Sequence, residues 1–339
     1  MGLFSVGTSA LSVSQGITLS NFTTMDKNKY HNPRALSYYE AERICEMTFL
    51  NTGPFYHLCT SGVQTEILFD DQEDFRFAMN LMAFCVWQTE GVIVLNFEIM
   101  ENHLHSVMAG KEERLMTCFS LFRRRLQRYL LDKGVIKDLS GFEATLFPID
   151  DLDTLRNTLA YVNRNGYLAD SRYTPFSYPW GANRFFFNPD IPLLQGKRYG
   201  DLTFREKRQL FRSHSIDYPA EHLVLDGYIS PVSFCKINLA ERMFQNARSY
   251  FFLLSRNVEA YRSIARQLGD LVYYTDDELF LIVRQLCKDT YGNSRPATLP
   301  KEAKLEMARK MHYEYQAGNK QIQRMLRLEE REVAALFGK

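Results

Sequence analysis

Hydrophobic positions in the first half of the chain switch between two spacings, which predict strands and helices in turn. Short apolar runs closed by turn residues predict strands at residues 54–62, 91–99 and 142–149. Longer segments with apolar residues three and four positions apart predict helices at residues 38–50, 67–88, 114–134 and 150–166. Asp70 or Asp71 caps the second helix, and Gly134 and the pair Asn165-Gly166 end the last two.

The order of these elements predicts four parts of the chain. Strands and helices alternate through residues 53–190, which is typical of a compact α/β or α+β sandwich. Residues 1–52 form an N-terminal extension. Residues 191–255 contain frequent Pro and Gly and form a connecting region. Residues 256–339 follow a helical pattern and predict a helical C-terminal domain.

The composition of the 339-residue chain is that of a globular protein, with 45% hydrophobic and 24% charged residues. Lys and Arg number 41 and Asp and Glu 40, and this formal net charge of +1 excludes a histone-like binder of duplex DNA. Six separated cysteines without a C-x-x-C pair predict reduced thiols rather than a zinc ribbon or a disulfide scaffold. The sequence contains no secretory signal, myristoylation pattern or membrane-spanning run, so we expect a cytoplasmic protein without a membrane partner.

The stretch "IMENHLHSVM" places two of the seven histidines, His103 and His105, on either side of Leu104. Alternate side chains of a strand share a face, so two imidazoles at this spacing can bind one divalent cation while Leu104 points into the core. The alternative is a pair of partly exposed polar residues at the end of a strand. The H-x-H pattern by itself is weak evidence for a metal site.

A second group of candidate residues lies in "LRNTLAYVNRN", where Tyr161 and Asn165 are four positions apart and share one face of the predicted helix. Next to two histidines they would add a nucleophile and an oxygen ligand. Tyr161 also fits a core aromatic residue, and Asn165 fits the end of a helix before Gly166. Spacing alone does not pair this helix with the two histidines.

Three blocks of the sequence together resemble the HUH single-tyrosine transposases, especially the REP-associated tyrosine transposases. "VIVLNFEIMENHLHSVMAG" is similar to the family's histidine strand, and "FYHLCTSGVQTEILFDDQEDFRFAMNLM" to its opening strand, loop and first helix. "LAYVNRNGYLAD" with "YPWGANRFFF" resembles its tyrosine helix and Tyr-Pro-Trp segment. The blocks follow the family's order between Phe55 and Phe187. The resemblance implies an α+β fold, an antiparallel ferredoxin-like or RRM-like sheet with helices packed on it, before a mostly helical C-terminal region.

The resemblance also implies the roles of individual residues. His103, His105 and Asn165 would bind a divalent metal, Mg²⁺ or Mn²⁺, and Tyr161 would attack a DNA phosphodiester. The product would be a covalent 5′-phosphotyrosine and a free 3′-hydroxyl on single-stranded or hairpin DNA, without a need for ATP. Both a monomer and a homodimer are compatible with these roles.

Two positions differ from the family's pattern. Glu101 stands where the family usually has proline before the Asn-His pair, and it adds a negative charge near a site meant for phosphate. Gly166 replaces the proline that often follows the asparagine of the tyrosine helix. Neither change removes a metal ligand or the nucleophile.

Basic residues that could contact DNA lie on the predicted helix at 114–134, at Arg123, Arg124, Arg125 and Arg128. Aromatic residues between them fit base stacking or core packing. The four arginines also fit the solvated face of an amphipathic helix. Arg184, next to three phenylalanines, has the same two interpretations.

The segment "NKQIQRMLRLEEREVAALF" has the outline of a helix-turn-helix. Its two short helices would pack through apolar residues at Ile322, Leu326, Leu328, Val333 and Leu336. Three glutamates at the start of the second helix repel phosphate. A role in packing or protein contact therefore competes with DNA binding.

We predict from these patterns a metal-dependent enzyme that nicks and rejoins single-stranded DNA. The alternative is a non-catalytic or domesticated DNA-binding or regulatory protein that keeps the fold and the helix-turn-helix. The presence of all four residues of the nicking site favours the enzyme. A metallohydrolase with a water nucleophile would need a further carboxylate or histidine cluster.

Overall fold

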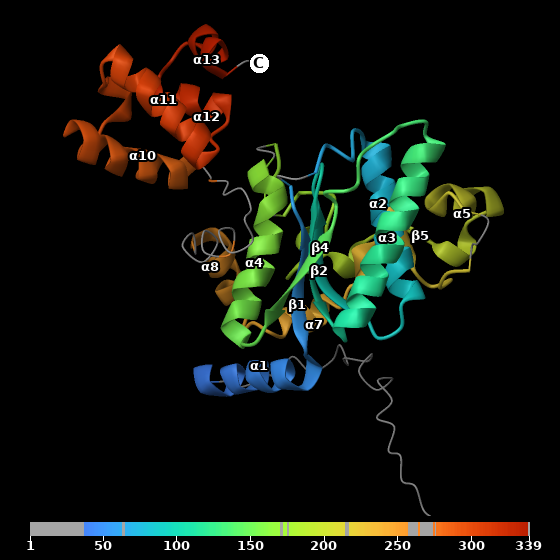
Figure 1. Ribbon diagram of the computed structural model, residues 1–339. Helices are drawn as coiled ribbons and strands as arrows, with labels where there is room; N and C mark the ends of the chain where they lie inside the picture. Colours follow the sequence, from blue (N-terminus) through green and yellow to red (C-terminus); the bar gives the residue numbers. More distant parts are fainter. Residues whose placement is uncertain are drawn as a thin grey trace, which may run out of the picture. The chain divides into compact units, whose positions relative to one another are not determined.

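The computed structural model describes residues 37–62, 65–169, 172–174, 176–213, 217–256, 264, 274 and 276–337. A four-stranded antiparallel sheet with the strand order β2-β3-β1-β4 organises the first part of the chain (Figure 1). Its strands are β1 (Phe55–Thr60), β2 (Ile93–Ile99), β3 (Leu104–Ala109) and β4 (Ala144–Ile149). Helices pack on this sheet, which confirms the predicted α+β class.

The helices cover both faces of the sheet. Figure 1 shows α4 (Leu152–Ala169) on one side of the strands and the pair α2 (Gln72–Gln88) and α3 (Glu112–Asp132) on the other. A further helix, α1 (Tyr38–Thr52), packs against α4. These elements lie where the hydrophobic pattern predicts them. The cap of α2 is Asp71, whose side chain accepts hydrogen bonds from the backbone N–H groups of the first turn.

The histidine segment differs from the prediction in one respect. The chain turns after Ile99, and the backbone N–H of Met100 donates to the carbonyl oxygen of His103 at 2.8 Å. The next strand begins at Leu104. His103 therefore lies in the tight turn between β2 and β3, and only His105 lies within a strand. Four turn residues were sufficient to reverse the chain, and the apolar pattern did not mark them.

The end of α4 also differs from the prediction. The helix continues to Ala169, three residues beyond Gly166. A glycine ends a helix when it takes a left-handed conformation with positive φ. Gly166 is not among the glycines with positive φ, and so the helix passes through it.

The region after α4 adds a small antiparallel sheet and several short helices. The sheet has the order β5-β6-β7. The elements are β5 (Lys197–Arg198), α5 (Phe204–Phe211), β6 (Leu223–Leu225), β7 (Tyr228–Ile229), α6 (Pro231–Phe234), α7 (Ile237–Glu241) and α8 (Ala247–Arg256). Their buried side chains belong to the same hydrophobic core as those of the four-stranded sheet. This core contains buried residues from Cys45 to Leu254.

The C-terminal helices have a core of their own, formed by buried residues between Tyr274 and Val333. The helices are α10 (Asp276–Tyr291), α11 (Lys301–Tyr315), α12 (Asn319–Leu326) and α13 (Glu330–Phe337). Ile322, Leu326, Leu328 and Val333 are buried between α12 and α13, and Leu336 is partly buried against them. The predicted packing of the two short helices is therefore confirmed. Within the described ranges, no helix has both the length and the apolar character needed to cross a membrane.

Candidate functional site

A row of buried polar side chains crosses the face of the sheet that α4 covers. His105 on β3 lies opposite Cys59 on β1 and opposite Glu98 on β2, and residues opposite each other in antiparallel strands share a face. His57, two positions before Cys59, lies on the same face. The four side chains are 0% to 6% exposed. Burying such groups in a core is costly unless they have a role or partners there, so the row is a candidate site.

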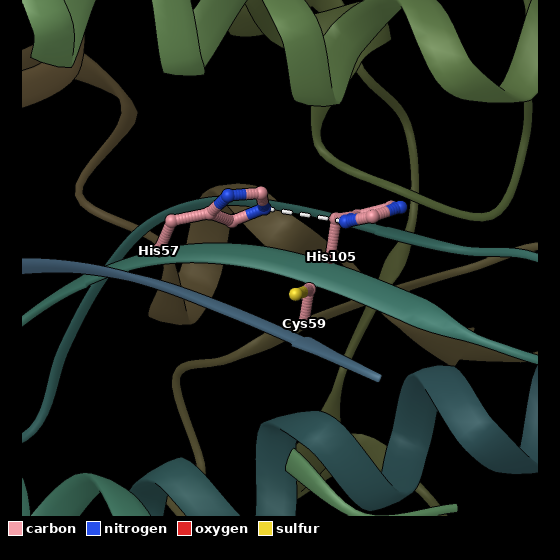
Figure 2. Close-up of side chains that lie close together, drawn as sticks. All are labelled: His57, Cys59 and His105. Carbon is pink, nitrogen blue, oxygen red and sulfur yellow. Dashed lines mark hydrogen bonds between the residues drawn. The ribbon is translucent and has the colours of Figure 1, made fainter. Parts of the chain in front are cut away.

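The two buried histidines contact each other directly. Nε2 of His57 lies 3.2 Å from Nδ1 of His105. Figure 2 shows the two rings side by side, with the Cys59 sulfur below the gap between them in this view. In the described part of the chain, the one group of three or more metal-binding side chains is His57, Cys59 and His105, whose donor atoms lie within 4.8 Å of one another.

His103 lies next to this cluster and is held by the turn. Its ring centroid is 5.1 Å from that of His105, and the two rings are nearly perpendicular at 86°. Nδ1 of His103 is 2.8 Å from Oδ1 of Asn102. The amide nitrogen of Asn102 donates to the carbonyl oxygens of Gly62 and Thr65, both at 2.8 Å. These bonds orient the imidazole through its Nδ1, as hydrogen bonds to the second ring nitrogen do in many metal sites.

Tyr161 on α4 packs against the histidines across the layer between helix and sheet. Its ring centroid lies 5.4 Å from that of His105 and 5.8 Å from that of His57. The side chain is only 1% exposed. Asn165 follows one turn later, is 3% exposed, and its amide nitrogen donates to the Tyr161 carbonyl oxygen at 3.1 Å. The structure thus brings Tyr161, His103 and His105 together, with Asn165 on the same helix.

Two candidate donor sets have His105 in common and suit different metals. His103, His105 and Asn165 offer two imidazoles and an amide oxygen, a mixed set compatible with Mg²⁺ or Mn²⁺. His57, Cys59 and His105 offer two imidazoles and a thiolate, a set that favours Zn²⁺. The sequence prediction missed His57 and Cys59. Their H-x-C spacing inside a predicted strand was the available signal, because it repeats the spacing of His103 and His105.

Glu98 is a third residue that the sequence prediction missed. Its Oε2 accepts a hydrogen bond from the backbone N–H of Gly166 at 2.7 Å. Complete burial raises the pKa of the Glu98 carboxyl well above its usual range, and the Gly166 N–H opposes this in part. The other oxygen, Oε1, has no hydrogen-bond partner among the described residues. A lone glutamate in the apolar run "VIVLNFEI" was the signal in the sequence.

Gly166 has a structural reason to be glycine. A Cβ atom at this position would lie 2.2 Å from Cδ1 of Tyr178, so the Tyr178 ring packs directly on the helix backbone. The Tyr178 hydroxyl donates to the Ile99 carbonyl oxygen at 2.6 Å. Proline here would also lack the N–H that bonds to Glu98. Glu98 and Tyr178 therefore both favour glycine over proline at position 166.

The proposed DNA-binding arginines lie away from Tyr161. Arg123, Arg124, Arg125 and Arg128 belong to α3, on the opposite side of the sheet from α4 (Figure 1).

Several of these arginines have structural contacts. Arg123 pairs with Glu143 at 2.5 Å, and the Arg125 guanidinium lies 4.0 Å from the centre of the Phe84 ring. Arg128 is 3.9 Å from Asp132. Arg184 donates to the Tyr228 hydroxyl at 2.7 Å and stacks over Phe185. Arg124 is exposed.

Comparison with known proteins identifies no family. No family model matches the sequence. No curated protein matches it either. A solved structure of a REP-associated tyrosine transposase bound to a REP hairpin aligns with 52% of this chain and 94% of that chain, at 8% sequence identity and a TM-score of 0.30. A likeness at this level supports no inference, so the site is interpreted from its own contacts.

Proposed function

We propose that this chain nicks and rejoins single-stranded DNA, with Tyr161 as nucleophile and a 5′-phosphotyrosine as intermediate. The observation that carries the proposal is the packing of the Tyr161 ring against His105, at 5.4 Å between centroids, with His103 next to His105. The buried phenol thereby lies against the buried His105 imidazole, and the partly buried His103 imidazole lies next to His105. Hairpin DNA is the substrate form that we expect.

The chemistry requires help for the tyrosine. A phenol with a pKa near 10 is a poor nucleophile at neutral pH. A divalent ion bound by His103, His105 and Asn165 would polarise a phosphate oxygen and hold the phosphorus for in-line attack. The bond from Tyr161 Oη to phosphorus forms as the bond from phosphorus to the 3′ oxygen breaks. The phenol proton is lost and the 3′ oxygen gains one, and the reverse reaction rejoins the strand.

The burial of Tyr161 sets a condition on this reaction. At 1% exposure the phenol cannot meet a phosphodiester until part of its cover moves. The ring lies between α4, which carries it, and His57 and His105 on the sheet. We therefore propose that α4 shifts relative to the sheet when DNA binds, before the chemical step.

The burial of Tyr161 also favours a second function, DNA binding without cleavage. A protein that binds DNA without cutting it can keep Tyr161 in its core permanently. In that case the ring is a packing residue against His57 and His105. Regulation through DNA binding would then be the activity.

An adduct assay separates the two functions. The full-length protein is incubated with a labelled hairpin oligonucleotide and Mn²⁺ or Mg²⁺, and a covalent complex is sought on a denaturing gel. We expect Tyr161→Phe to lower adduct formation at least about a hundredfold, because the nucleophile is gone. Tyr167→Phe is the matched control, since Tyr167 lies on the same helix and is half-buried.

Each outcome has a defined meaning. An equal amount of adduct in Tyr161→Phe would show that the nucleophile is another residue. If adduct formation survives both a chelator and His103→Ala, the reaction does not need the proposed metal ion. Tight hairpin binding without adduct under any condition would establish the DNA-binding alternative.

A further inference from the structure

His57 and Cys59 on β1 extend the group of metal-binding side chains beyond the histidine turn. Because they are two residues apart on one strand, their side chains share the face that α4 covers. Cys59 lies directly opposite His105 in the antiparallel register. The strand pairing, rather than a flexible loop, therefore fixes the three side chains close together. They are 2%, 6% and 0% exposed.

The distances suit tetrahedral coordination. Two nitrogens bound to one Zn²⁺ at about 2.0–2.1 Å lie about 3.3 Å apart. Nε2 of His57 and Nδ1 of His105 are 3.2 Å apart. A sulfur and a nitrogen on the same ion lie about 3.5 Å apart. The three donors all lie within 4.8 Å, so a shift of roughly 1 Å by the thiol would complete the set.

We propose that His57, Cys59 and His105 form a buried binding site for Zn²⁺ or a similarly soft divalent ion. A buried thiolate with two imidazoles selects such an ion over Mg²⁺, whose preferred ligands are oxygens. On binding, the Cys59 thiol loses its proton to solvent and the sulfur forms a bond to the ion. Three protein ligands leave a fourth coordination position. The inference stands on these contacts and does not rest on the proposed DNA chemistry.

His105 belongs both to this site and to the set with His103 and Asn165. A neutral imidazole has one lone pair available for a metal, because its other ring nitrogen carries the proton. His105 can therefore bind one ion through Nδ1, with His57 and Cys59, or another through Nε2, but not both as a neutral ring. Occupation of the thiolate site excludes His105 from the other set.

Two measurements on the full-length protein test the site, with Co²⁺ and Zn²⁺ as the probes. Metal-free protein is titrated with Co²⁺ and followed by absorption. We expect one ion per chain, intense tetrahedral d–d bands and a sulfur-to-metal charge-transfer band in the near ultraviolet. X-ray absorption of the protein loaded with Zn²⁺ should show one sulfur at about 2.3 Å. This second measurement uses the wild-type chain and needs no variant to fold.

Variants identify the cysteine that supplies the sulfur ligand. Cys59→Ser should lose the charge-transfer band, and His57→Gln should weaken binding of Co²⁺. Cys118→Ser is the matched control: Cys118 is also buried, at 2% exposure, and burial raises the pKa of its thiol to about 12. His103→Ala should keep the band.

The outcomes separate this inference from the proposed function. Absence of a sulfur signal in the wild type, or a signal that Cys59→Ser leaves intact, overturns the thiolate site. Loss of the signal in His103→Ala but not in Cys59→Ser overturns it as well. Because neither measurement contains DNA, a sulfur signal together with no adduct from metal-free protein given Mn²⁺ or Mg²⁺ removes only the proposed function. Adduct formation without a sulfur signal removes only this site.

Discussion

The buried carboxyl of Glu98 links the stability of the folded chain to pH. In the folded chain its carboxyl is fully buried beside Gly166 and retains its proton to a higher pH than usual. In the unfolded chain it ionises near the ordinary value of 4.5. Above that pH the folded state therefore binds one proton more than the unfolded state, and the free energy of unfolding decreases as pH rises.

Glu98→Gln tests this difference in proton binding. The amide stays neutral and its oxygen can still accept from the Gly166 N–H. From pH 4.5 up to the raised pKa, the free energy of unfolding of the wild type should fall relative to that of the variant by about 1.4 kcal/mol per pH unit. Urea unfolding at several pH values measures the difference. Glu101→Gln, an exposed neighbour, should follow the wild type; parallel curves for wild type and Glu98→Gln would contradict the prediction.

At the residue scale, the sequence identifies as candidates those positions that have a local signature. His103, His105, Tyr161 and Asn165 stand at short, fixed spacings that identify them as candidates. His57, Cys59 and Glu98 belong to the same buried row only through strand register. Register brings together positions 40 or more residues apart on β1 and β3, and no spacing within one segment encodes it.

At the scale of elements, a buried arginine connects α4 to α1. The guanidinium of Arg156 forms a two-pronged ion pair with Glu42 at 2.7 and 2.9 Å, and its Nε donates to the Met243 carbonyl oxygen at 2.7 Å. The hydrogen bond from Arg156 lowers the pKa of the Glu42 carboxyl. One side chain of the tyrosine helix therefore joins three segments of the chain.

Arg156→Lys should loosen this junction. Lysine keeps the charge but not the planar fork, so we expect a loss of about 1–3 kcal/mol in the free energy of unfolding and faster hydrogen exchange in α1. Asp153→Asn is the control, because Asp153 also reaches Arg156 but its side chain is 85% exposed. A loss as large in Asp153→Asn as in Arg156→Lys would show that Glu42 is not the important partner.

At this scale the hydrophobic pattern predicted α1 to α4 and the strands β1, β2 and β4 and placed them well, but it predicted neither β3 as a separate strand nor β5 to β7. It missed the turn between β2 and β3 and the last three residues of α4. Both errors concern the conformation of the backbone, which the hydrophobic pattern does not record. The turn is closed by one hydrogen bond between Met100 and His103, and Gly166 remains helical because Tyr178 and Glu98 surround it.

For the whole molecule, the two separate cores predict two unfolding events. One core extends from Cys45 to Leu254, and the other from Tyr274 to Val333. Both tryptophans of the chain, Trp87 and Trp180, lie in the stretch that contains the first core, so their fluorescence reports on that core. Far-ultraviolet circular dichroism reports on the helices of both.

Leu326→Ala tests this independence. Leu326 is completely buried in the C-terminal core, and its truncation should cost about 2–5 kcal/mol there. We expect the unfolding transition followed by dichroism to separate into two steps with different melting temperatures. The transition followed by fluorescence should keep its melting temperature. Leu159→Ala, an equally buried residue of α4, should shift the fluorescence transition instead. If fluorescence and dichroism shift together in Leu326→Ala, the cores unfold as one unit.

The contact between Gly166 and Tyr178 has an evolutionary consequence. A side chain at position 166 requires a smaller residue at 178, and proline at 166 removes the donor that faces Glu98. Either change at position 166 by itself leaves a clash with Tyr178 or a buried carboxyl without its N–H. Relatives of this protein should therefore vary at positions 98, 166 and 178 jointly, and an alignment that contains them should show these three columns as a covarying group.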